Sequence, residues 1–518
     1  MVTLIILDGL GVTEDQESTF WVASRKNFEG YEKSYPLTTL QASGIAVGLS
    51  WGEAGNSEVG HLTLGAGKTV YHHLPRISVS IQDGSFFETP AFKRTSEKVK
   101  KNKSALHLIG LFSSGTVHAY PDHLYALLEF AKREKLPKVY LHLFTDGRDA
   151  SPTEGANFFG FLEERISKLF PFARVGSIIG RDFSMDRDGD WGEIEKTYNL
   201  LTKGEGSKFK NSAKYLGGQY AKGITDEYIE PAWDGENESR IKDGDAAIFF
   251  NFREDSAREL TEAFIEEGFD KFPRKKISDL EFVTMTEYEN KFSSLAAFAP
   301  LNVFMPLAKV IADKNLKQFH IAETEKYAHV TYFFNGGNET PYPGENRLLV
   351  ESLLGSHYEE HPEMRAEKIA DEVISRIKNY DFILVNLANA DMVGHTGDFE
   401  ATQRALEVLD REVGRIVEEI LKNDGIVIIT GDHGNAEEKR YRVTGEKKTK
   451  HSVNPVPIFL IGKKFERENP RTKEEIMKQY NKVGGVISDV APTILELMGI
   501  EKPADMTGVS LLKELTGK

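Results

Sequence analysis

The chain has 518 residues, of which 40% are hydrophobic and 28% charged, and its formal net charge is −15. This length exceeds what one hydrophobic core supports, so we expect about two to four domains. So acidic a chain argues against nucleic acid or an anionic membrane as the main partner, whereas a small anionic substrate needs only a local cluster of arginines. The lack of cysteine excludes disulfides, zinc–thiolate sites and thiol catalysis.

The N-terminus does not resemble a secretion signal. Its apolar run, residues 4–7, is shorter than a signal-peptide core, no basic region precedes it, and no later run approaches membrane-spanning length. We therefore expect a soluble cytoplasmic protein, and we expect it to act as a monomer on a small molecule.

Short apolar runs that lead to acidic residues occur near both ends of the chain. They are residues 4–7 before Asp8, 382–386 before Asp391, and 426–430 before Asp432 and His433. Such runs are typical of buried parallel strands, and ligands of open α/β sheets bind beyond the carboxyl ends of the strands. Residues 400–422 have the apolar spacing of a crossover helix, and Asp489 is predicted to cap a helix that ends at Gly499.

The middle of the chain repeats this pattern with cationic or hydrogen-bonding residues at the strand ends. The runs are 106–111 before His118, 139–144 before Asp146–Asp149, 175–179 before Arg181 and Arg187, and 246–252 before Arg253. Arginine recognises carboxylates and phosphates through paired hydrogen bonds. The pattern therefore predicts a second α/β domain that binds an anion.

The two ends of the chain are predicted to share one site, which makes the middle an insertion. We assign residues 1–75 and 299–518 to a discontinuous metal-binding domain and residues 76–298 to the inserted domain. The hinges are expected near Pro75 and residues 297–300, where small residues and proline accumulate.

Carboxylates and imidazoles gather at the predicted strand ends of the discontinuous domain. They are Asp8, Asp391, His395, Asp432, His433 and His451. Each one alone has an ordinary explanation, because an Asp after a strand often caps a helix and a single His is often a satisfied polar residue. Their joint occurrence predicts a site for Mn, Zn or a similar divalent ion.

The turn 55–61 presents Ser57, our candidate nucleophile. The turn could equally be a simple helix N-cap. A metal ion beside Ser57 would favour its alkoxide form, and the arginines imply that the group transferred is phosphoryl. Lys326 has the alternative of an ion-paired surface lysine, which its spacing alone does not overturn.

Eight motifs together resemble one enzyme family along the whole chain. They are residues 7–9, 55–61, 146–149, 180–188, 251–253, 323–331, 391–397 and 432–437. In this order they resemble the 2,3-bisphosphoglycerate-independent phosphoglycerate mutases. The resemblance implies an alkaline-phosphatase-like domain that binds two Mn²⁺ ions, with a second α/β domain inserted into it, and the interconversion of 3-phosphoglycerate and 2-phosphoglycerate in glycolysis and gluconeogenesis.

The resemblance also implies roles for individual residues. One ion would bind Asp391, His395 and His451, and the other would bind Asp8, Ser57, Asp432 and His433. Ser57 would carry the phosphoryl group, with Lys326 beside it. The residues that would hold phosphoglycerate are His118, Arg148, Asp149, Arg181, Arg187 and Arg253, and Asp149 would transfer a proton on the glycerate hydroxyl.

Three stretches depart from the family pattern. Ser256 stands where a second arginine is usual, so the phosphate clamp is thinner or Arg258 substitutes for it; residues 115–117 and 51–54 also differ. Two alternatives therefore stay open. One is another metal-dependent phosphomutase or phosphomonoesterase of the alkaline phosphatase superfamily, and the other is a non-catalytic phosphoglycerate sensor.

Overall fold

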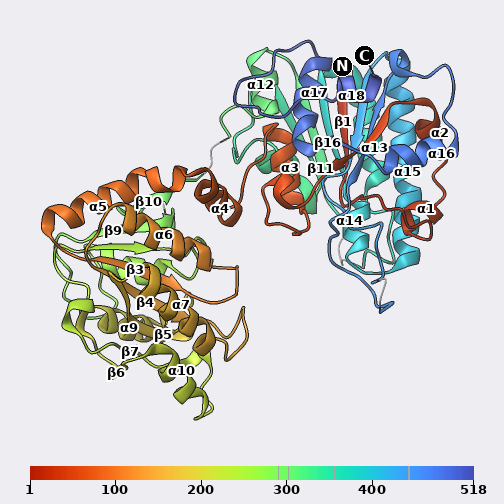
Figure 1. Ribbon diagram of the computed structural model, residues 1–518. Helices are drawn as coiled ribbons and strands as arrows, with labels where there is room; N and C mark the ends of the chain where they lie inside the picture. The colour runs from red at the N-terminus through yellow and green to blue at the C-terminus, as the bar shows by residue number, and fades with distance from the viewer. Residues whose placement is uncertain (290, 301–302, 354–356, 442–443, 518) are drawn as a thin grey trace. The chain divides into compact units, whose positions relative to one another are not determined.

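The computed structural model describes residues 1–289, 291–300, 303–353, 357–441 and 444–517. The chain divides into two compact units (Figure 1). Unit 1 is formed by both ends of the chain, Met1–His72 and Leu301–Lys518, and unit 2 by His73–Pro300. The divisions assigned from the sequence lay at 75/76 and 298/299. Each unit is built on one eight-stranded sheet, so the expected α/β fold class is confirmed.

The sheet of unit 1 places the three predicted acidic strand ends next to each other. Its order is β12-β11-β13-β1-β14-β15-β2-β16, and β1 lies between β13 and β14, parallel to both. The strands are β1 Val2–Leu7, β2 Leu37–Gln41, β11 Gln318–Glu323, β12 Glu345–Val350, β13 Phe382–Leu387, β14 Ile426–Thr430, β15 Val456–Ile461 and β16 Val483–Val486.

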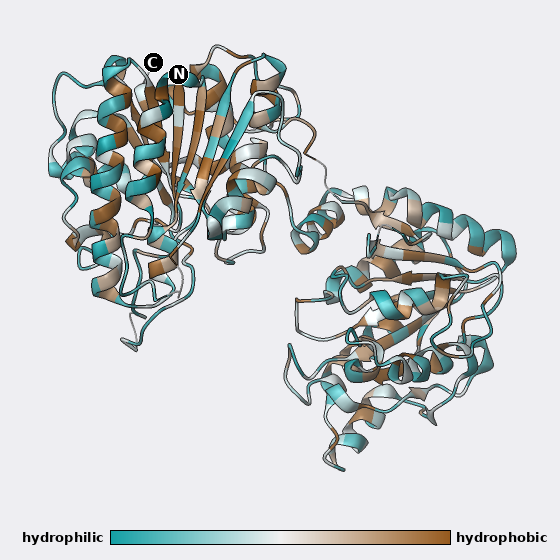
Figure 2. Ribbon diagram, turned by 180° about the vertical axis from the view of Figure 1, so that it is seen from behind, coloured by the Kyte–Doolittle hydropathy of each residue, from teal (hydrophilic) through white to brown (hydrophobic). Residues whose placement is uncertain are grey.

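The central strands of unit 1 are apolar because helices cover both faces of the sheet. Every residue of β1 and β13 is buried. One face packs against a cluster that includes Val413 and Ile416, and the other against a cluster that includes Leu64 and Ile494. Figure 2 shows the resulting hydrophobic colour along the strands. Parallel strands buried on two faces require such continuous apolar runs.

The helices of unit 1 agree with the sequence pattern where the apolar spacing is long. They are α1 Thr19–Val22, α2 Lys26–Ser34, α3 Ser57–Ala66, α12 Leu307–Asp313, α13 Ala366–Arg376, α14 Asn389–Gly394, α15 Phe399–Lys422, α16 Lys473–Tyr480, α17 Val490–Leu497 and α18 Leu512–Thr516. The helix expected over 400–422 is confirmed as α15. Among the described residues, no helix is long and apolar enough to cross a membrane.

The predicted capping role of Asp489 is wrong. Asp489 does precede α17, but its side chain makes no hydrogen bond to that helix. Its carboxylate instead accepts hydrogen bonds from the backbone N–H of Val486, at 3.0 Å, and of Val509, at 2.8 Å. The residue therefore ties a preceding strand and the C-terminal segment to the start of the helix.

Unit 2 contains a second mostly parallel sheet of order β10-β9-β8-β3-β4-β5-β7-β6. Its strands are β3 Leu106–Leu111, β4 Val139–Thr145, β5 Ala173–Gly180, β6 Ser207–Lys208, β7 Ala232–Trp233, β8 Ala246–Phe249, β9 Glu281–Thr286 and β10 Leu295–Phe298. Its helices are α4 His73–Asp83, α5 Pro90–Asn102, α6 Pro121–Arg133, α7 Gly155–Leu169, α8 Arg181–Ser184, α9 Trp191–Lys203, α10 Ser212–Tyr220 and α11 Arg258–Ile265.

The strand expected over 246–252 is shorter than its apolar run. β8 ends at Phe249, although the next three residues stay buried. The cause is the Asn251 side chain, whose Oδ1 accepts a hydrogen bond from the backbone N–H of Leu111 at 2.9 Å. This side-chain bond takes the place of the backbone hydrogen bonds between β3 and β8, and the chain continues from there toward Arg253.

Buried histidine makes the stability of unit 2 sensitive to acid. Burial lowers the pKa of His123 to about 3, whereas an unfolded histidine titrates near 6.5. Below pH 6.5 the unfolded chain binds a proton that the folded chain does not. The stabilisation is therefore complete above pH 6.5 and is lost as the pH falls toward 3, by about 1.4 kcal/mol per pH unit.

We expect urea unfolding at pH 5 to show about 2 kcal/mol less stability from His123 than at pH 7. His123→Phe should remove this part of the pH dependence, because Phe suits the surrounding Tyr120 and Phe252 rings. The exposed His361 provides the control, and His361→Gln should keep the wild-type dependence. Equal pH dependence in His123→Phe and wild type would contradict this explanation.

Candidate active site

Ser57 is the first residue of α3 and lies at its N-terminus. The side chain of the preceding Asn56 caps the helix by accepting a hydrogen bond from Val59 N–H at 3.0 Å. Ser57 itself is 7% exposed. The N-terminus of a helix favours negative charge, so this position suits a phosphorylated serine. Both earlier interpretations of the turn therefore apply, with Asn56 as the cap and Ser57 free for chemistry.

The Ser57 hydroxyl lies among charged groups from three other segments. Its Oγ is 3.0 Å from Asp8 Oδ1, 3.0 Å from His433 Nε2 and 2.7 Å from Lys326 Nζ. Lys326 Nζ also lies 2.6 Å from Asp8 Oδ1 and 2.6 Å from Asp391 Oδ2. Lys326 is only 4% exposed, so the alternative of a surface lysine is wrong.

The pKa values of this cluster reflect buried charges that compensate one another. Burial opposes ionisation of Asp8, but Lys326 and His433 together hold the pKa of Asp8 well below its usual range. Burial also opposes the charge on Lys326, yet Asp8 and Asp391 raise its pKa. For His433, burial is outweighed by Asp432 and Asp391, which raise its pKa to about 9. The site thus favours cations over neutral groups.

Strand pairing brings the three aspartates together. Leu7 at the end of β1 pairs with Leu387 at the end of β13, and Ile6 pairs with Thr430 at the end of β14. Asp8 and Asp432 follow β1 and β14, and Asp391 lies in α14. A Cβ at Gly60 would lie 2.8 Å from Asp432 Cβ, so only glycine lets α3 approach this closely.

His395 and His451 point their Nε2 atoms at the same carboxylate. The Nδ1 atoms of the two rings lie 2.9 Å and 2.7 Å from the carbonyl oxygens of Thr449 and Gly55. A carbonyl only accepts, so the Nδ1 atoms carry the protons and the Nε2 atoms present lone pairs. The two Nε2 atoms lie 3.1 Å apart, and each lies 3.3 Å from Asp391 Oδ1. The hydrogen bond to Asp391 raises the pKa of His395, so these three atoms favour a cation, either a proton or a metal ion.

The described residues contain three groups with the spacing of metal ligands. They are Asp391 with His395 and His451; Asp8 with Asp391 and His433; and Asp8 with His61 and Asp432. The first two contain five of the seven residues expected as ligands, and Asp432 is in the third. These groups combine carboxylate and imidazole ligands and carry excess negative charge, which suits divalent first-row metal ions.

His61 was not among the expected site residues. Its Nδ1 lies 2.8 Å from Ser57 O and 3.2 Å from Asp432 Oδ2, and its Nε2 lies 2.9 Å from Asn386 Nδ2. Asn386 also donates to Asp8 Oδ2 at 2.8 Å. Both ring nitrogens are therefore engaged, and His61 lies beside Asp432 and supports Asn386, which donates to Asp8. Its position four residues after Ser57 on α3 was the available signal.

The expected substrate residues of unit 2 form a connected group at the strand ends. Arg181 Nη1 donates to Asp146 Oδ1 at 2.7 Å and to Asp149 Oδ2 at 2.6 Å. Its Nη2 lies 3.1 Å from His118 Nε2. Asp146 also accepts from Ser113 Oγ at 2.7 Å. Three of the six expected residues, His118, Asp149 and Arg181, thus meet in one place.

His118 presents a hydrogen-bond donor toward this site. Arginine only donates, so the Nε2 that faces Arg181 accepts and the proton lies on Nδ1. Burial, together with the charge of Arg181, lowers the pKa of His118 to about 4, so the ring is neutral. Among the described residues Nδ1 has no hydrogen-bond partner, and Asp255 Oδ1 lies 3.7 Å away. A bound anion could accept this N–H.

Arg187 and Arg253 converge on one carboxylate. Arg187 Nη1 and Arg253 Nη2 each lie 2.9 Å from Asp255 Oδ2. Both guanidinium groups are about half exposed, at 52% and 46%. Two exposed guanidiniums around one carboxylate oxygen have the geometry of an anion clamp, which extends the group around His118.

Ser256 and Arg258 do not enlarge this clamp. Ser256 is buried, and its backbone N–H bonds to Asp255 Oδ1 at 2.8 Å. Arg258 Nε donates to the carbonyl of Tyr288 at 2.9 Å, and its Nη2 lies 3.8 Å from Glu254. Arg258 therefore contacts the segment after β9, and these contacts do not include Asp255.

Arg148 is the expected substrate residue that the structure places apart from the clamp. Its Nε donates to Glu227 Oε1 at 2.8 Å, and its Nη2 lies 3.8 Å from Asp182. Its backbone N–H nevertheless bonds to Asp146, the residue that orients Arg181.

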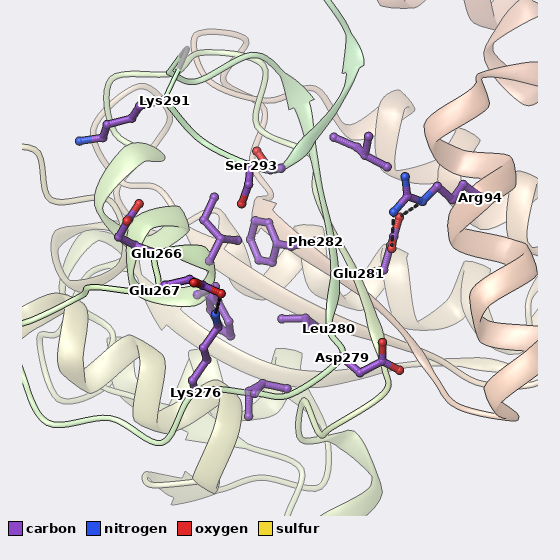
Figure 3. A pocket seen from close by; sticks show the side chains of 15 residues that line it. Arg94, Glu266, Glu267, Lys276, Asp279, Leu280, Glu281, Phe282, Lys291 and Ser293 are labelled. Carbon is purple, nitrogen blue, oxygen red and sulfur yellow. Dashed lines mark hydrogen bonds and ion pairs between the residues drawn. The ribbon is translucent and has the colours of Figure 1, made fainter.

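A separate hollow of about 630 Å³ opens beside β9 and β10 in unit 2 (Figure 3). Ion pairs between Arg94 and Glu281 and between Lys276 and Glu267 cross its lining. None of the six expected substrate residues is among the described residues that line it. The cluster at the strand ends, rather than this hollow, is therefore the candidate substrate site.

Comparison with known proteins identifies the family. The family described as "BPG-independent PGAM N-terminus (iPGM_N)" matches residues 77–290, and "Sulfatase" matches residues 249–500. The chain is 42% identical to the 2,3-bisphosphoglycerate-independent phosphoglycerate mutase of Clostridium acetobutylicum, over 99% of both chains. It belongs to the 2,3-bisphosphoglycerate-independent phosphoglycerate mutase family.

Further comparisons agree with this family over the full length. The enzyme of the same name from Moorella thermoacetica is 43% identical, over 98% of both chains. A crystal structure of Leishmania mexicana phosphoglycerate mutase at low cobalt concentration is 28% identical, with a TM-score of 0.54, and covers 98% of this chain and 97% of its own. Members of this mutase family are isomerases, which confirms the enzyme class expected from the sequence.

Proposed function

We propose that this protein interconverts 3-phosphoglycerate and 2-phosphoglycerate, as an isomerase of glycolysis and gluconeogenesis in the cytoplasm, through a phosphoserine at Ser57. The observation that carries the proposal is the Ser57 hydroxyl, held within 3.0 Å of Asp8, His433 and Lys326 at a helix N-terminus. Family membership supplies the substrate. A phosphoryl transfer needs an in-line nucleophile and concentrated positive charge, and this cluster offers both.

We infer that the anionic substrate binds to the cluster of unit 2. Arg187 and Arg253 would hold one anionic group by charge-assisted hydrogen bonds, in competition with Asp255. His118 Nδ1–H and Arg181 would hold a second group. Arg148 would contribute from the adjacent loop after a change of partner from Glu227.

We propose that two divalent ions, most simply Mn²⁺, complete the site of unit 1. Asp391, His395 and His451 would hold one ion, and Asp8, Ser57, Asp432 and His433 the other. When bound, the ions supply positive charge that lowers the pKa of a serine hydroxyl and neutralises phosphoryl oxygens. The support for them is the convergence of lone pairs on Asp391 Oδ1.

The proposed reaction moves the phosphoryl group twice. Ser57 Oγ loses its proton and attacks phosphorus, the bond from phosphorus to the glycerate oxygen breaks, and that oxygen takes up one proton. The glycerate then turns, and its other hydroxyl loses a proton and attacks phosphorus, which breaks the bond to Ser57 Oγ; this oxygen takes up one proton again. Lys326 Nζ stabilises the phosphoryl oxygens in both steps, and Asp149 is suited to exchange the proton of the glycerate hydroxyl. Water must be excluded, since hydrolysis would release phosphate.

The experiment that tests this function is a ³¹P NMR assay of the purified protein with 3-phosphoglycerate and Mn²⁺ and without 2,3-bisphosphoglycerate. We expect 2-phosphoglycerate to accumulate to equilibrium without inorganic phosphate. Release of inorganic phosphate as the main product would favour the phosphomonoesterase alternative. Binding of phosphoglycerate with no product would favour the sensor alternative.

Arg253→Ala is expected to raise the KM for 3-phosphoglycerate by about 10- to 100-fold, because it removes a charge-assisted hydrogen bond of roughly 1.5–3 kcal/mol. Steady-state kinetics would measure the change. Arg258→Ala is the matched control and should leave KM within about twofold, because Arg258 engages Tyr288 and Glu254. An equal rise in both variants would assign Arg258 to the clamp.

A further inference from the structure

Glu437 is a buried carboxylate beside the candidate metal site that is not among its expected ligands. It lies in the loop after β14 and is 1% exposed. Its Oε2 accepts hydrogen bonds from the backbone N–H of Gly11, at 3.1 Å, and of Asn435, at 3.0 Å. Its Oε1 accepts from Ser452 Oγ and, at 2.9 Å, from Asn454 Nδ2. The carboxylate of Glu437 therefore accepts hydrogen bonds from four different groups.

The four donors come from two loops. Gly11 lies in the loop after β1, whereas Asn435 lies near the start of the β14–β15 connection, which also carries Glu437, and Ser452 and Asn454 lie near its end. The same loops carry proposed ligands for both ions. These are Asp8 in the first loop and Asp432, His433 and His451 in the second.

The loop after β1 packs directly on this carboxylate. A Cβ at Gly11 would lie 2.5 Å from Glu437 Cδ and 2.6 Å from Oε2, so a larger residue there would displace the carboxylate from its present position. The contact between Gly11 and Glu437 therefore sets the distance between the loop after β1 and the loop after β14. Glycine permits this close approach because it has no side chain.

Helix α14, which carries Asp391, is joined to this arrangement through the buried Lys439. Lys439, which is 2% exposed, donates to the carbonyl of Gly394 at 2.7 Å and to Asn435 Oδ1. Asn435 Nδ2 in turn donates to Asp391 Oδ1 at 2.8 Å. Glu437 thus fixes the backbone of Asn435, and the side chain of Asn435 in turn holds the carboxylate of Asp391.

We propose that Glu437 is a positioning residue for the two-metal centre, which fixes the loops of Asp8, Asp432 and His451 at the spacing that metal binding requires. The proposal rests on the proposed function. Groups that orient metal ligands in this way typically change metal affinity or activity about 10- to 100-fold when altered.

Glu437→Gln tests the proposal with a nearly isosteric change. In either orientation the negative charge is lost, and the NH₂ faces either the backbone N–H groups of Gly11 and Asn435, which cannot accept, or Ser452 and Asn454, which must turn to accept it. We expect the affinity for Mn²⁺, titrated calorimetrically into the chelator-treated full-length protein, to fall about 10- to 100-fold. We expect kcat at limiting Mn²⁺ to fall with it, while the KM for 3-phosphoglycerate, set by the arginines of unit 2, stays within about twofold.

Glu438→Gln is the matched control, because Glu438 is the adjacent residue, is half-buried and pairs with Lys448. It should keep wild-type Mn²⁺ affinity. A merely structural Glu437 would give a variant with a lower melting temperature and unchanged Mn²⁺ affinity, and that result would overturn the proposal.

If Glu437→Gln does not fold, Ser452→Ala carries the test, since it removes one donor from the loop of His451 and leaves the carboxylate in place. We expect its Mn²⁺ affinity to fall several-fold, and wild-type affinity would overturn the proposal. The proposed function fails in a different way, because the wild-type protein itself would then bind no Mn²⁺ or form no 2-phosphoglycerate.

Discussion

Ser57→Ala is expected to abolish mutase turnover, with a fall in kcat of about 10⁴-fold or more, as is typical when a nucleophile is removed. The reason is that, among the residues that the structure describes, only the Ser57 hydroxyl is hydrogen-bonded to Asp8, His433 and Lys326. The phosphoenzyme should disappear with the activity. Intact-protein mass spectrometry after a rapid quench would detect it as one added phosphoryl group in the wild type.

Ser50→Ala, in the loop that precedes the nucleophile, is the matched control and should keep both the activity and the phosphoenzyme. Retention of a phosphoenzyme in Ser57→Ala would reassign the nucleophile. Retention of turnover without any phosphoenzyme would point to direct transfer between the two hydroxyls. Either outcome contradicts the central role of Ser57.

Removal of divalent metal is expected to have the second-largest effect, a loss on the order of 10³-fold or more, because Lewis-acid stabilisation contributes several kcal/mol. Asp8 and Asp391 share Lys326, and the buried Asp432 and Asp391 raise the pKa of His433, so this cluster of three buried aspartates favours cations. Added Mn²⁺ should restore activity and raise the melting temperature, because a ligand that binds the folded state stabilises it.

The effect of metal removal can be checked by its pH dependence and by its specificity for divalent ions. Protons compete with metal for imidazole, so the Mn²⁺ affinity should fall as the pH decreases through the titration of the histidine ligands. The melting temperature of chelated protein should not respond to K⁺ at equal ionic strength. Full mutase activity in protein verified to be free of metal would contradict the proposed mechanism.

Much of the arrangement of strands was predictable from local sequence patterns. The runs before Asp8, Asp391 and Asp432 had the length and composition of strands buried on both faces, and they form the adjacent strands β13, β1 and β14. Parallel strands end at the same edge of a sheet, so these patterns also predicted which side chains would gather.

What depended on three-dimensional packing could not be predicted. The spacing of Lys326 gave no sign that it is buried, because its partners Asp8 and Asp391 are 318 and 65 residues away. Glu437 has the sequence of an ordinary acidic loop residue, and only tertiary contacts reveal its four donors. Asp489 was misjudged because its carboxylate, which a local rule assigned to the following helix, binds the backbone N–H groups of Val486 before it and Val509 after the helix.

The pairing of Arg187 and Arg253 with Asp255 is a further feature that only contacts reveal. The sequence showed Ser256 at the position of a usual arginine but left open whether Arg258 replaces it. The structure pairs Arg258 with Tyr288 and Glu254, which leaves Arg187 and Arg253 on Asp255.

The measurement that tests the central claim most directly is a crossover experiment with doubly labelled substrate. 3-Phosphoglycerate with ¹⁸O in the phosphoryl group and ¹³C in the glycerate would be mixed with unlabelled substrate and converted by the Mn²⁺-loaded protein. If the phosphoryl group leaves to Ser57 and returns to the same retained glycerate, mass spectrometry will find both labels together in 2-phosphoglycerate. Product molecules that carry only one of the labels would contradict the account.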